Sequence, residues 1–88
     1  MKVGVIGLGG LGYIGARAAA LVGAEVYGAE VNPETQKLAD EIGLAGVADS
    51  IDAFKDKGLE LIVDYAGFGT TTAAALETLS EFGTLVQV

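Results

Sequence analysis

A glycine-rich turn and one acidic residue are the parts of this sequence best suited to chemistry. The turn reads Gly7-Leu8-Gly9-Gly10-Leu11-Gly12, and Glu30 follows Gly12 by 18 positions. Glycine lacks a Cβ atom, so it permits a tight turn and a close approach of a ligand to the backbone. A helix that begins in such a turn presents N–H groups and the positive end of its dipole to a phosphate. The carboxylate of Glu30 can accept hydrogen bonds from both hydroxyl groups of a ribose.

The position of the glycines matters more than their number, because 14 of the 88 residues are glycine and a lone match has little weight. One register, Gly7, Gly9 and Gly12, starts directly after an apolar run and ends where a helical pattern opens. A second register, Gly10, Gly12 and Gly15, would begin inside that helix. We therefore assign the first register to a dinucleotide-binding βαβ unit, and we expect Gly15 to permit close packing of the helix on a strand.

Short apolar runs alternate with helical patterns along the whole chain, which predicts an α/β fold. Runs of this kind are typical of parallel strands covered on both faces. The expected strands are Lys2–Ile6, Glu25–Ala29, Val47–Ala48, Leu59–Tyr65 and Thr84–Val88. The pattern predicts a Rossmann-like three-layer α/β/α domain over residues 1–88, with a five-stranded parallel sheet of order 3-2-1-4-5 and the sixth strand missing.

Four helices are expected between these strands, at about 10–22, 33–42, 51–57 and from Thr70 or Thr71 to the residue before Gly83. Asn32 followed by Pro33 is typical of a helix start. Helical spacing selects the side chains that we expect to be buried. They are Leu11, Ile14, Ala18 and Leu21 or Val22 in the first helix, Leu38, Ala39 and Ile42 in the second, Ile51 and Phe54 in the third, and Leu76, Leu79 and Phe82 in the last.

Composition limits the functions that this chain can have. The sequence has no cysteine and no histidine, so disulfides, thiolate chemistry and the usual zinc ligands are absent. A net charge of −7 argues against nucleic acid or an anionic membrane as a partner. No apolar run reaches the roughly 18–20 residues of a membrane span. We expect a cytoplasmic domain with no catalytic residues and no metal site of its own.

The whole chain resembles the coenzyme-binding half of the medium-chain dehydrogenase/reductase superfamily, which includes the zinc-dependent alcohol dehydrogenases. The matching segments are Val5 to Gly12, Gly23 to Val26, Gly28 to Pro33, Lys37 to Ala39 with Ile42-Gly43, Leu61 to Asp64 with Gly67, and Gly83 to Val86. This resemblance implies a domain that binds NAD and supplies it for hydride transfer with substrate held by a separate catalytic domain. Zinc, if the parent protein uses it, would be bound in that other domain.

The resemblance also assigns individual positions in the coenzyme site. It implies that the diphosphate lies on the backbone of Gly10 and Leu11 and that the adenosine ribose contacts Glu30. The end of the fourth strand, with Tyr65, Ala66 and Gly67, would line the adenosine side. The sequence departs from the family in two places: Glu30 replaces the commoner Asp, and Thr35 stands where a basic residue is frequent.

Charge predicts that the coenzyme is NAD rather than NADP. A 2′-phosphate beside Glu30 would place like charges about 4–5 Å apart, at a cost on the order of 3 kcal/mol for an effective dielectric near 20. Neither Val31 nor Asn32 supplies a positive charge to offset this repulsion.

Two other functions compete with this interpretation. One is a methyltransferase core that binds S-adenosylmethionine, although Val5 and Ile6 stand where an acid is usual in that class. The other is a non-enzymatic nucleotide-sensing or interaction module. The last expected strand ends with the chain, so we interpret the sequence as a piece of a longer dehydrogenase whose fifth-strand edge allows self-association.

Overall fold

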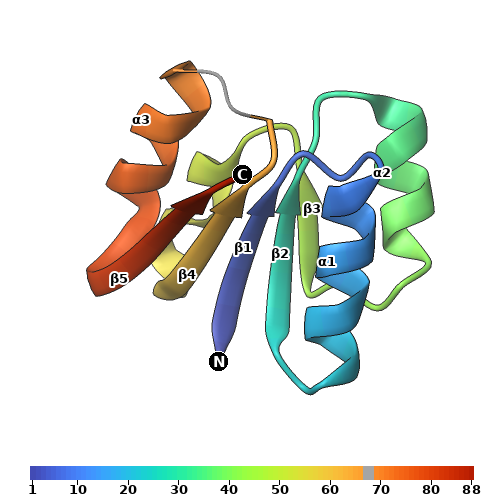
Figure 1. The fold of residues 1–88 in the computed structure, drawn as a ribbon, viewed down its shortest axis with the longest axis horizontal. Coiled ribbons are helices and arrows are strands. Elements are labelled where there is room, and N and C mark those ends of the chain that lie inside the picture. The colour runs from blue at the N-terminus through green and yellow to red at the C-terminus, as the bar shows by residue number, and fades with distance from the viewer. Residues whose placement is uncertain (67–68) are drawn as a thin grey trace.

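The sheet is parallel throughout, with β1 (Lys2–Ile6) at its centre and the order β3-β2-β1-β4-β5 in the computed structural model (Figure 1). The structure describes residues 1–66 and 69–88, and residues 69 and 70 by their backbone alone. On one side of β1 lie β2 (Glu25–Ala29) and β3 (Gly46–Ala48), and on the other lie β4 (Leu59–Asp64) and β5 (Leu79–Gln87). The predicted fold class and strand order are confirmed.

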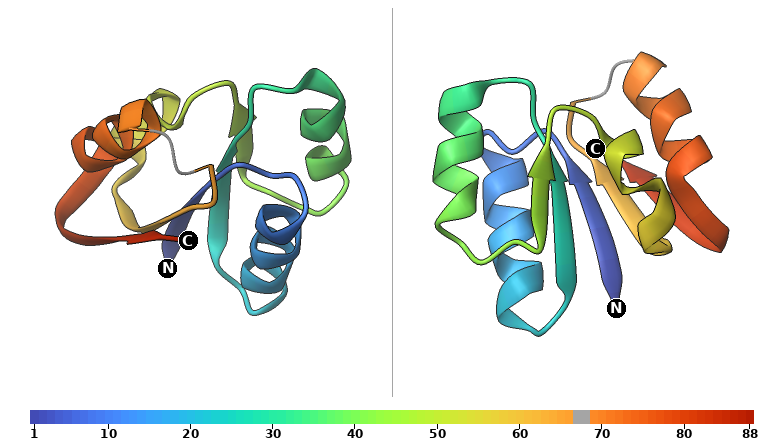
Figure 2. Two further views of the ribbon diagram at one scale, coloured as in Figure 1. Left: turned by 45° about the horizontal axis from the view of Figure 1, so that its top comes forward. Right: turned by 180° about the vertical axis from the view of Figure 1, so that it is seen from behind.

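Helices cover both faces of the sheet, which gives the three expected layers (Figure 2). Helices α1 (Leu11–Leu21) and α2 (Pro33–Asp40) pack on one face; the 3₁₀ helix η1 (Ile51–Lys57) and α3 (Gly69–Thr78) pack on the other. Each face of the sheet has its own cluster of buried side chains, one around Val5, Leu8 and Ala16 and one around Ile51, Leu59 and Ile62.

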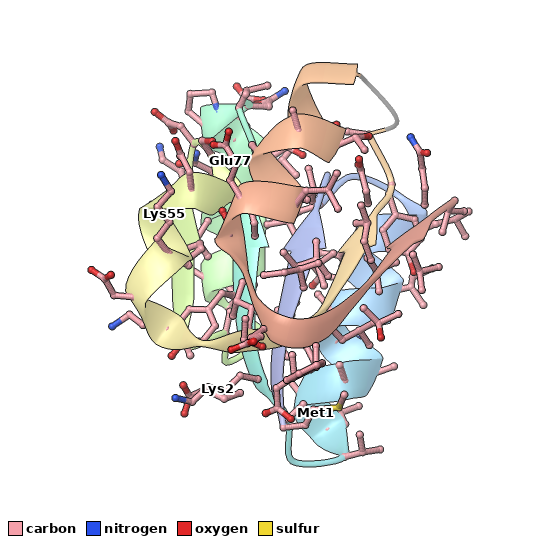
Figure 3. The ribbon with its side chains drawn as sticks, turned by 90° about the vertical axis from the view of Figure 1, so that its left-hand side faces the viewer. Met1, Lys2, Lys55 and Glu77 are labelled. Atoms are coloured by element: carbon pink, nitrogen blue, oxygen red, sulfur yellow. The ribbon has the colours of Figure 1, made fainter. Side chains whose placement is uncertain are left out.

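The parallel arrangement brings the carboxyl ends of all five strands to one edge of the molecule. Ile6 pairs with Ala29 on β2 and with Asp64 on β4, so the residues that follow these three strands emerge side by side. Met1 and Lys2 lie at the opposite, amino edge (Figures 1 and 3). A crevice outside the carboxyl ends is where open α/β sheets bind ligands.

The helices in the described part of the chain are all too short or too polar to span a membrane.

The prediction of the buried face of α1 was wrong. Leu11, Ile14, Leu21 and Val22 are exposed, and the buried positions are Gly12 and Ala16. The helix lies so close to the chain below it that a Cβ atom on Gly12 would be 1.6 Å from the carbonyl oxygen of Gly7. Only very small residues fit at such a contact, so the larger apolar side chains face outward.

The other helix predictions were partly correct. Asn32 caps α2 as expected, because its side chain accepts a hydrogen bond from the Glu34 amide at 2.9 Å. Ala39 is buried and Ile42 is half-buried, but Leu38 is exposed. In η1, both Ile51 and Phe54 are buried, and Gly58 ends the helix with a left-handed φ of 69°.

The last helix is shorter than predicted. It ends at Thr78, and β5 begins at Leu79 rather than at Thr84. Leu79 is half-buried and packs on the core, whereas Leu76 and Phe82 are exposed, contrary to expectation. Phe82 has a φ of +66° and is 95% exposed, so it is a strained residue at the irregular part of β5 instead of a core residue.

Candidate coenzyme-binding site

The glycine turn joins β1 to α1 at the carboxyl edge of the sheet. Gly7 has a φ of +84°, a conformation that favours glycine, and its amide donates a hydrogen bond to the Ala29 carbonyl at 2.8 Å. This bond extends the pairing of β1 with β2 by one residue. Gly10 has a φ of +56° and is the N-cap of α1. The first assigned register, from Gly7 through Gly12, is therefore the one that forms the turn.

The space in front of Gly9 and Gly10 is open. A Cβ atom built on either residue would have no neighbour within 4 Å, apart from its own chain neighbours. No side chain caps α1, and its first turn has no acidic residue. The positive end of this helix therefore faces accessible space, which suits the approach of a diphosphate.

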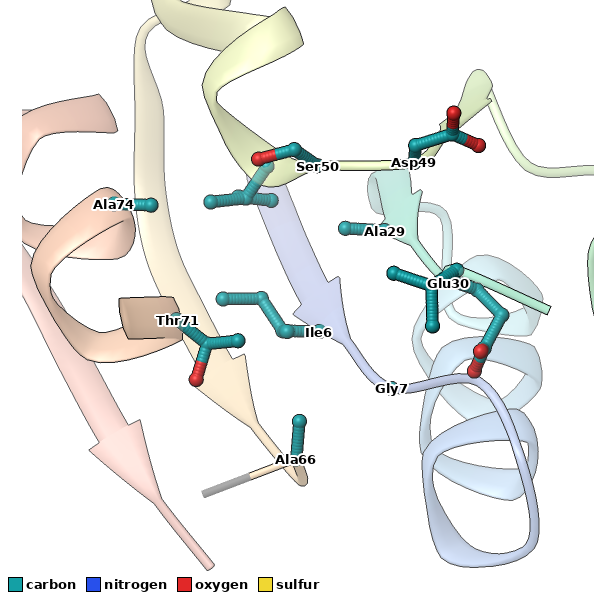
Figure 4. A pocket seen from close by; sticks show the side chains of 11 residues that line it. Ile6, Gly7, Ala29, Glu30, Asp49, Ser50, Ala66, Thr71 and Ala74 are labelled. Atoms are coloured by element: carbon teal, nitrogen blue, oxygen red, sulfur yellow. The ribbon is translucent and has the colours of Figure 1, made fainter. Parts of the chain in front are cut away.

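Glu30 lies directly after β2 and turns its carboxylate toward the glycine turn (Figure 4). Its Oε1 atom accepts a hydrogen bond from the Leu8 amide at 2.8 Å, and its Oε2 atom accepts one from the Asn32 amide at 2.9 Å. A carboxylate oxygen has two lone pairs, so each oxygen keeps the capacity to accept a further hydrogen bond. Glu30 is thus a held acceptor and not a freely solvated acid at the end of a strand.

Gln36 on α2 joins the ends of two neighbouring strands. Its Nε2 atom donates to the Glu30 carbonyl and, at 2.7 Å, to Oδ1 of Asp49. The Glu30 amide in turn donates to the Ala48 carbonyl at 2.9 Å. These bonds fix the position of Glu30 relative to the segment that follows β3.

Asp64 at the end of β4 is completely buried. Its Oδ1 atom accepts a hydrogen bond from the Ala66 amide, and its Oδ2 atom accepts one from the Thr71 hydroxyl, both at 2.9 Å. The sequence favoured a turn or capping carboxylate at this position, and the structure agrees.

A cavity of about 460 Å³ lies beside Glu30, between the ends of β1, β2 and β4 and the start of α3 (Figure 4). Its apolar wall comes mainly from Ile6, Ala29, Ile51, Ala66 and Ala74. Its polar side chains are Glu30, Asp49, Ser50 and Thr71. A mostly apolar cavity with a few fixed polar groups is typical of a small-ligand site, and this one could hold a flat ring next to the Glu30 carboxylate.

The structure brings together most of the residues selected from the sequence. Gly7, Glu30 and Ala66 line the cavity, Gly9 and Gly10 lie in the adjoining turn, and Gly12 lies in the first turn of α1. Leu11 is the first residue of α1, and its side chain is exposed. Gly67 lies outside the described residues.

Tyr65 occupies a different place from the other selected residues. Its ring packs against α1, where the hydroxyl oxygen would be 2.6 Å from a Cβ atom on Gly15. Only its backbone is close to Ala66 at the cavity. Tyr13 and Arg17 line a separate shallow groove between α1 and the end of α2.

Sequence reasoning missed the groups that hold this site in place. The Leu8 amide, Gln36, Asp49 and Thr71 were not selected, because the hydrogen bonds through which they act form only in the folded chain. Only the position of Asp49 and Ser50 directly after a strand could have indicated that they reach the carboxyl edge.

With this geometry established, comparison with known proteins identifies the family. A profile described as zinc-binding dehydrogenase matches residues 10–88. The chain belongs to this family. The corresponding part of such enzymes is the Rossmann domain of medium-chain dehydrogenases, and the chain is an NAD(P)-binding domain of that class. No curated protein matches this member of the zinc-binding dehydrogenase family by sequence.

Solved structures support the same fold. Alcohol dehydrogenase TADH from Thermus sp. ATN1 has a TM-score of 0.89 and 23% identity, over 99% of this chain and 28% of that one. Acetophenone reductase from Geotrichum candidum, in complex with NAD, has a TM-score of 0.80 and 26% identity, over 96% and 25%. A Sinorhizobium meliloti protein bound to NADP has a TM-score of 0.86 and 22% identity, over 98% and 29%. The chain thus spans less than a third of each of these proteins.

The zinc of this family does not fit the residues present here. The sequence has no histidine and no cysteine, and the part of the chain that the structure describes holds no group of three or more acidic residues placed to bind a metal ion. The dinucleotide does fit, because the glycine turn is open and Glu30 is held beside a cavity.

Proposed function

We propose that this domain binds NAD(H) with the diphosphate over Gly9–Gly12 and the adenosine in the cavity beside Glu30. The observation that supports this most directly is the hydrogen bond from the Leu8 amide to Glu30. It holds the ribose acceptor against the glycine turn before any ligand binds, so the sites for diphosphate and ribose are adjacent and preformed.

In this proposal the adenine base enters between the end of β2 and the start of α3. Ala66 and Ile51 would contact the base, and the backbone of Tyr65 would border the ribose. In this proposal each part of an adenosine diphosphate would be bound within these 88 residues. The nicotinamide ring would extend past the glycine turn, away from this cavity.

We propose that NAD is preferred over NADP. The Glu30 carboxylate accepts hydrogen bonds from two backbone amides, so turning it away from a 2′-phosphate would break both. Repulsion on the order of 3 kcal/mol at 4–5 Å corresponds to about a hundred-fold in affinity before screening by solvent. Since Glu30 is only half-buried, we expect at least ten-fold.

Calorimetric titration with NADH and NADPH tests this preference. The wild-type domain should bind NADH at least ten-fold more tightly. Glu30→Gln removes the charge, keeps an oxygen acceptor and should reduce the ratio to about three-fold or less. Glu34→Gln is the matched control, because it removes one charge from a nearby exposed residue and should leave the ratio unchanged. Equal binding of the two coenzymes by the wild type would refute the role of Glu30.

We further propose that hydride transfer occurs only together with a catalytic domain, which would hold the substrate and any zinc. Hydride chemistry belongs to the coenzyme, and the protein must supply a second surface for the substrate. The much greater length of the similar structures supports this view. The family match favours an NAD(P)-binding domain of an oxidoreductase over a methyltransferase core.

Two further expectations stay proposals. The lack of cysteine fits a reducing compartment, so we propose a cytoplasmic location. The outer edge of β5 has no charged residue from Thr84 to Val88, so we propose that it can pair with a second chain.

A further inference from the structure

The buried carboxylate of Asp64 connects two parts of the cavity wall. Ala66, which follows β4, and Thr71, in the first turn of α3, both line the cavity, and both donate hydrogen bonds to Asp64. A buried carboxylate is costly unless hydrogen bonds satisfy it, so its position is fixed by these partners. Asp64 itself does not line the cavity.

Asp64 also contacts the start of α3, which is another helix that begins at this edge of the sheet. Helix α3 begins at Gly69, and the Thr71 hydroxyl in its first turn reaches Asp64 at 2.9 Å. Neither α1 nor α3 has an acidic residue in its first turn, but the Asp64 carboxylate reaches the start of α3 through Thr71.

We propose that Asp64 and Thr71 are positioning residues for adenosine. Their hydrogen bond keeps the start of α3 at the distance from Ala66 that gives the cavity its width. On the opposite wall of the cavity, Gln36 holds Glu30 and Asp49 in position through its hydrogen bonds to both. This inference rests on the proposed function, and it adds that affinity for the adenosine half depends on a group that does not contact the ligand.

Thr71→Val is the most informative change, because it removes the hydroxyl and keeps the branched shape of the side chain. NMR titration with ADP-ribose should show binding weaker by about five- to ten-fold, whereas binding of inorganic pyrophosphate should change less than two-fold. Thr71→Ser keeps the donor and should stay within about two-fold of the wild type for both ligands. Thr72→Val is the matched control: it makes the same change at the next position of α3, which does not line the cavity.

Hydrogen exchange in the free protein provides a readout that needs no ligand. Asp64→Asn should accelerate exchange of the Ala66 amide, and Thr72→Val should not. ADP-ribose binding that is unchanged in Thr71→Val would overturn the inference, as would an equal loss of ADP-ribose and pyrophosphate binding, which indicates a general structural role. A wild-type domain that binds no ADP-ribose would instead refute the proposed function itself.

Discussion

The contact between Gly15 and Tyr65 allows a quantitative test of the packing beside the glycine turn. Replacing glycine by alanine within a helix normally stabilises it by about 1 kcal/mol. In this protein the new methyl group would lie 2.6 Å from the Tyr65 hydroxyl oxygen, and ordinary contact begins at 3.4 Å. The ring must therefore shift by about 0.8 Å (3.4 − 2.6), at a cost of about 1–3 kcal/mol in a packed region. Gly15→Ala should thus be neutral or destabilising, by about 0–2 kcal/mol.

Removing the hydroxyl should reverse the sign of this effect. In the Tyr65→Phe background the nearest atom to the new methyl group is Cζ, at an acceptable 3.4 Å. Gly15→Ala should then stabilise the domain by about 1 kcal/mol. Urea unfolding of the wild type, both single variants and the double variant gives the coupling energy, which we expect to be about 1–3 kcal/mol. If Gly15→Ala changes the free energy of unfolding equally in both backgrounds, the Tyr65 hydroxyl does not occupy this place.

Three more predictions follow from single residues. Gly9→Ala should leave the free energy of unfolding unchanged within about 0.5 kcal/mol, because its methyl group enters open space, and it should abolish NADH binding, because the diphosphate is proposed to occupy that space. Gly12→Ala should lower the free energy of unfolding by about 3 kcal/mol, because its Cβ atom would be 1.6 Å from the Gly7 carbonyl oxygen. Urea unfolding that finds Gly9→Ala the more destabilising of the two would contradict the structure. Phe82→Gly should stabilise the domain by about 1 kcal/mol in thermal unfolding by relieving a left-handed φ, whereas Phe82→Ala, which keeps that strain, should not. The Tyr27 hydroxyl donates to the Glu25 carboxylate, and this bond, with burial and the charge of Glu25, raises the pKa of Tyr27 above 10.0. The folded state therefore binds this proton more tightly than the unfolded chain, so the stabilisation is present below pH 10.0 and is lost as the pH rises through the folded-state pKa. In Tyr27→Phe, the free energy of unfolding should fall less steeply over this pH range.

The sequence predicted the parts of the fold that depend on local patterns. Apolar runs located all five strands, and Asn32-Pro33 and Gly58 located a helix start and a helix end. Alternation of strands and helices then fixed the parallel order, since right-handed crossovers leave few other arrangements. The glycine turn and Glu30 were found in the same way, because their spacing reflects the length of one βαβ unit.

The errors arose where tertiary contacts override periodicity. Helix α1 is apolar on most sides, so its pattern could not show that closeness to Gly7 selects Gly12 and Ala16 for the buried face. Phe82 was expected in the core because its spacing continued that of α3, but the chain turns before it into β5. The hydrogen bonds of Glu30 and Asp64 link residues through the folded chain, so a sequence pattern does not reveal them.

In the proposed binding mode a diphosphate lies where β1 meets α1 and its ribose lies at Glu30. Titration of the isotope-labelled domain with NADH, followed through its backbone amide resonances, tests this most directly. We expect the largest shifts at Gly9 to Gly12, at Leu8 and at Glu30, and little change at the amino edge around Lys2. Saturable binding that leaves the amide resonances from Leu8 to Gly12 unshifted would refute this binding mode.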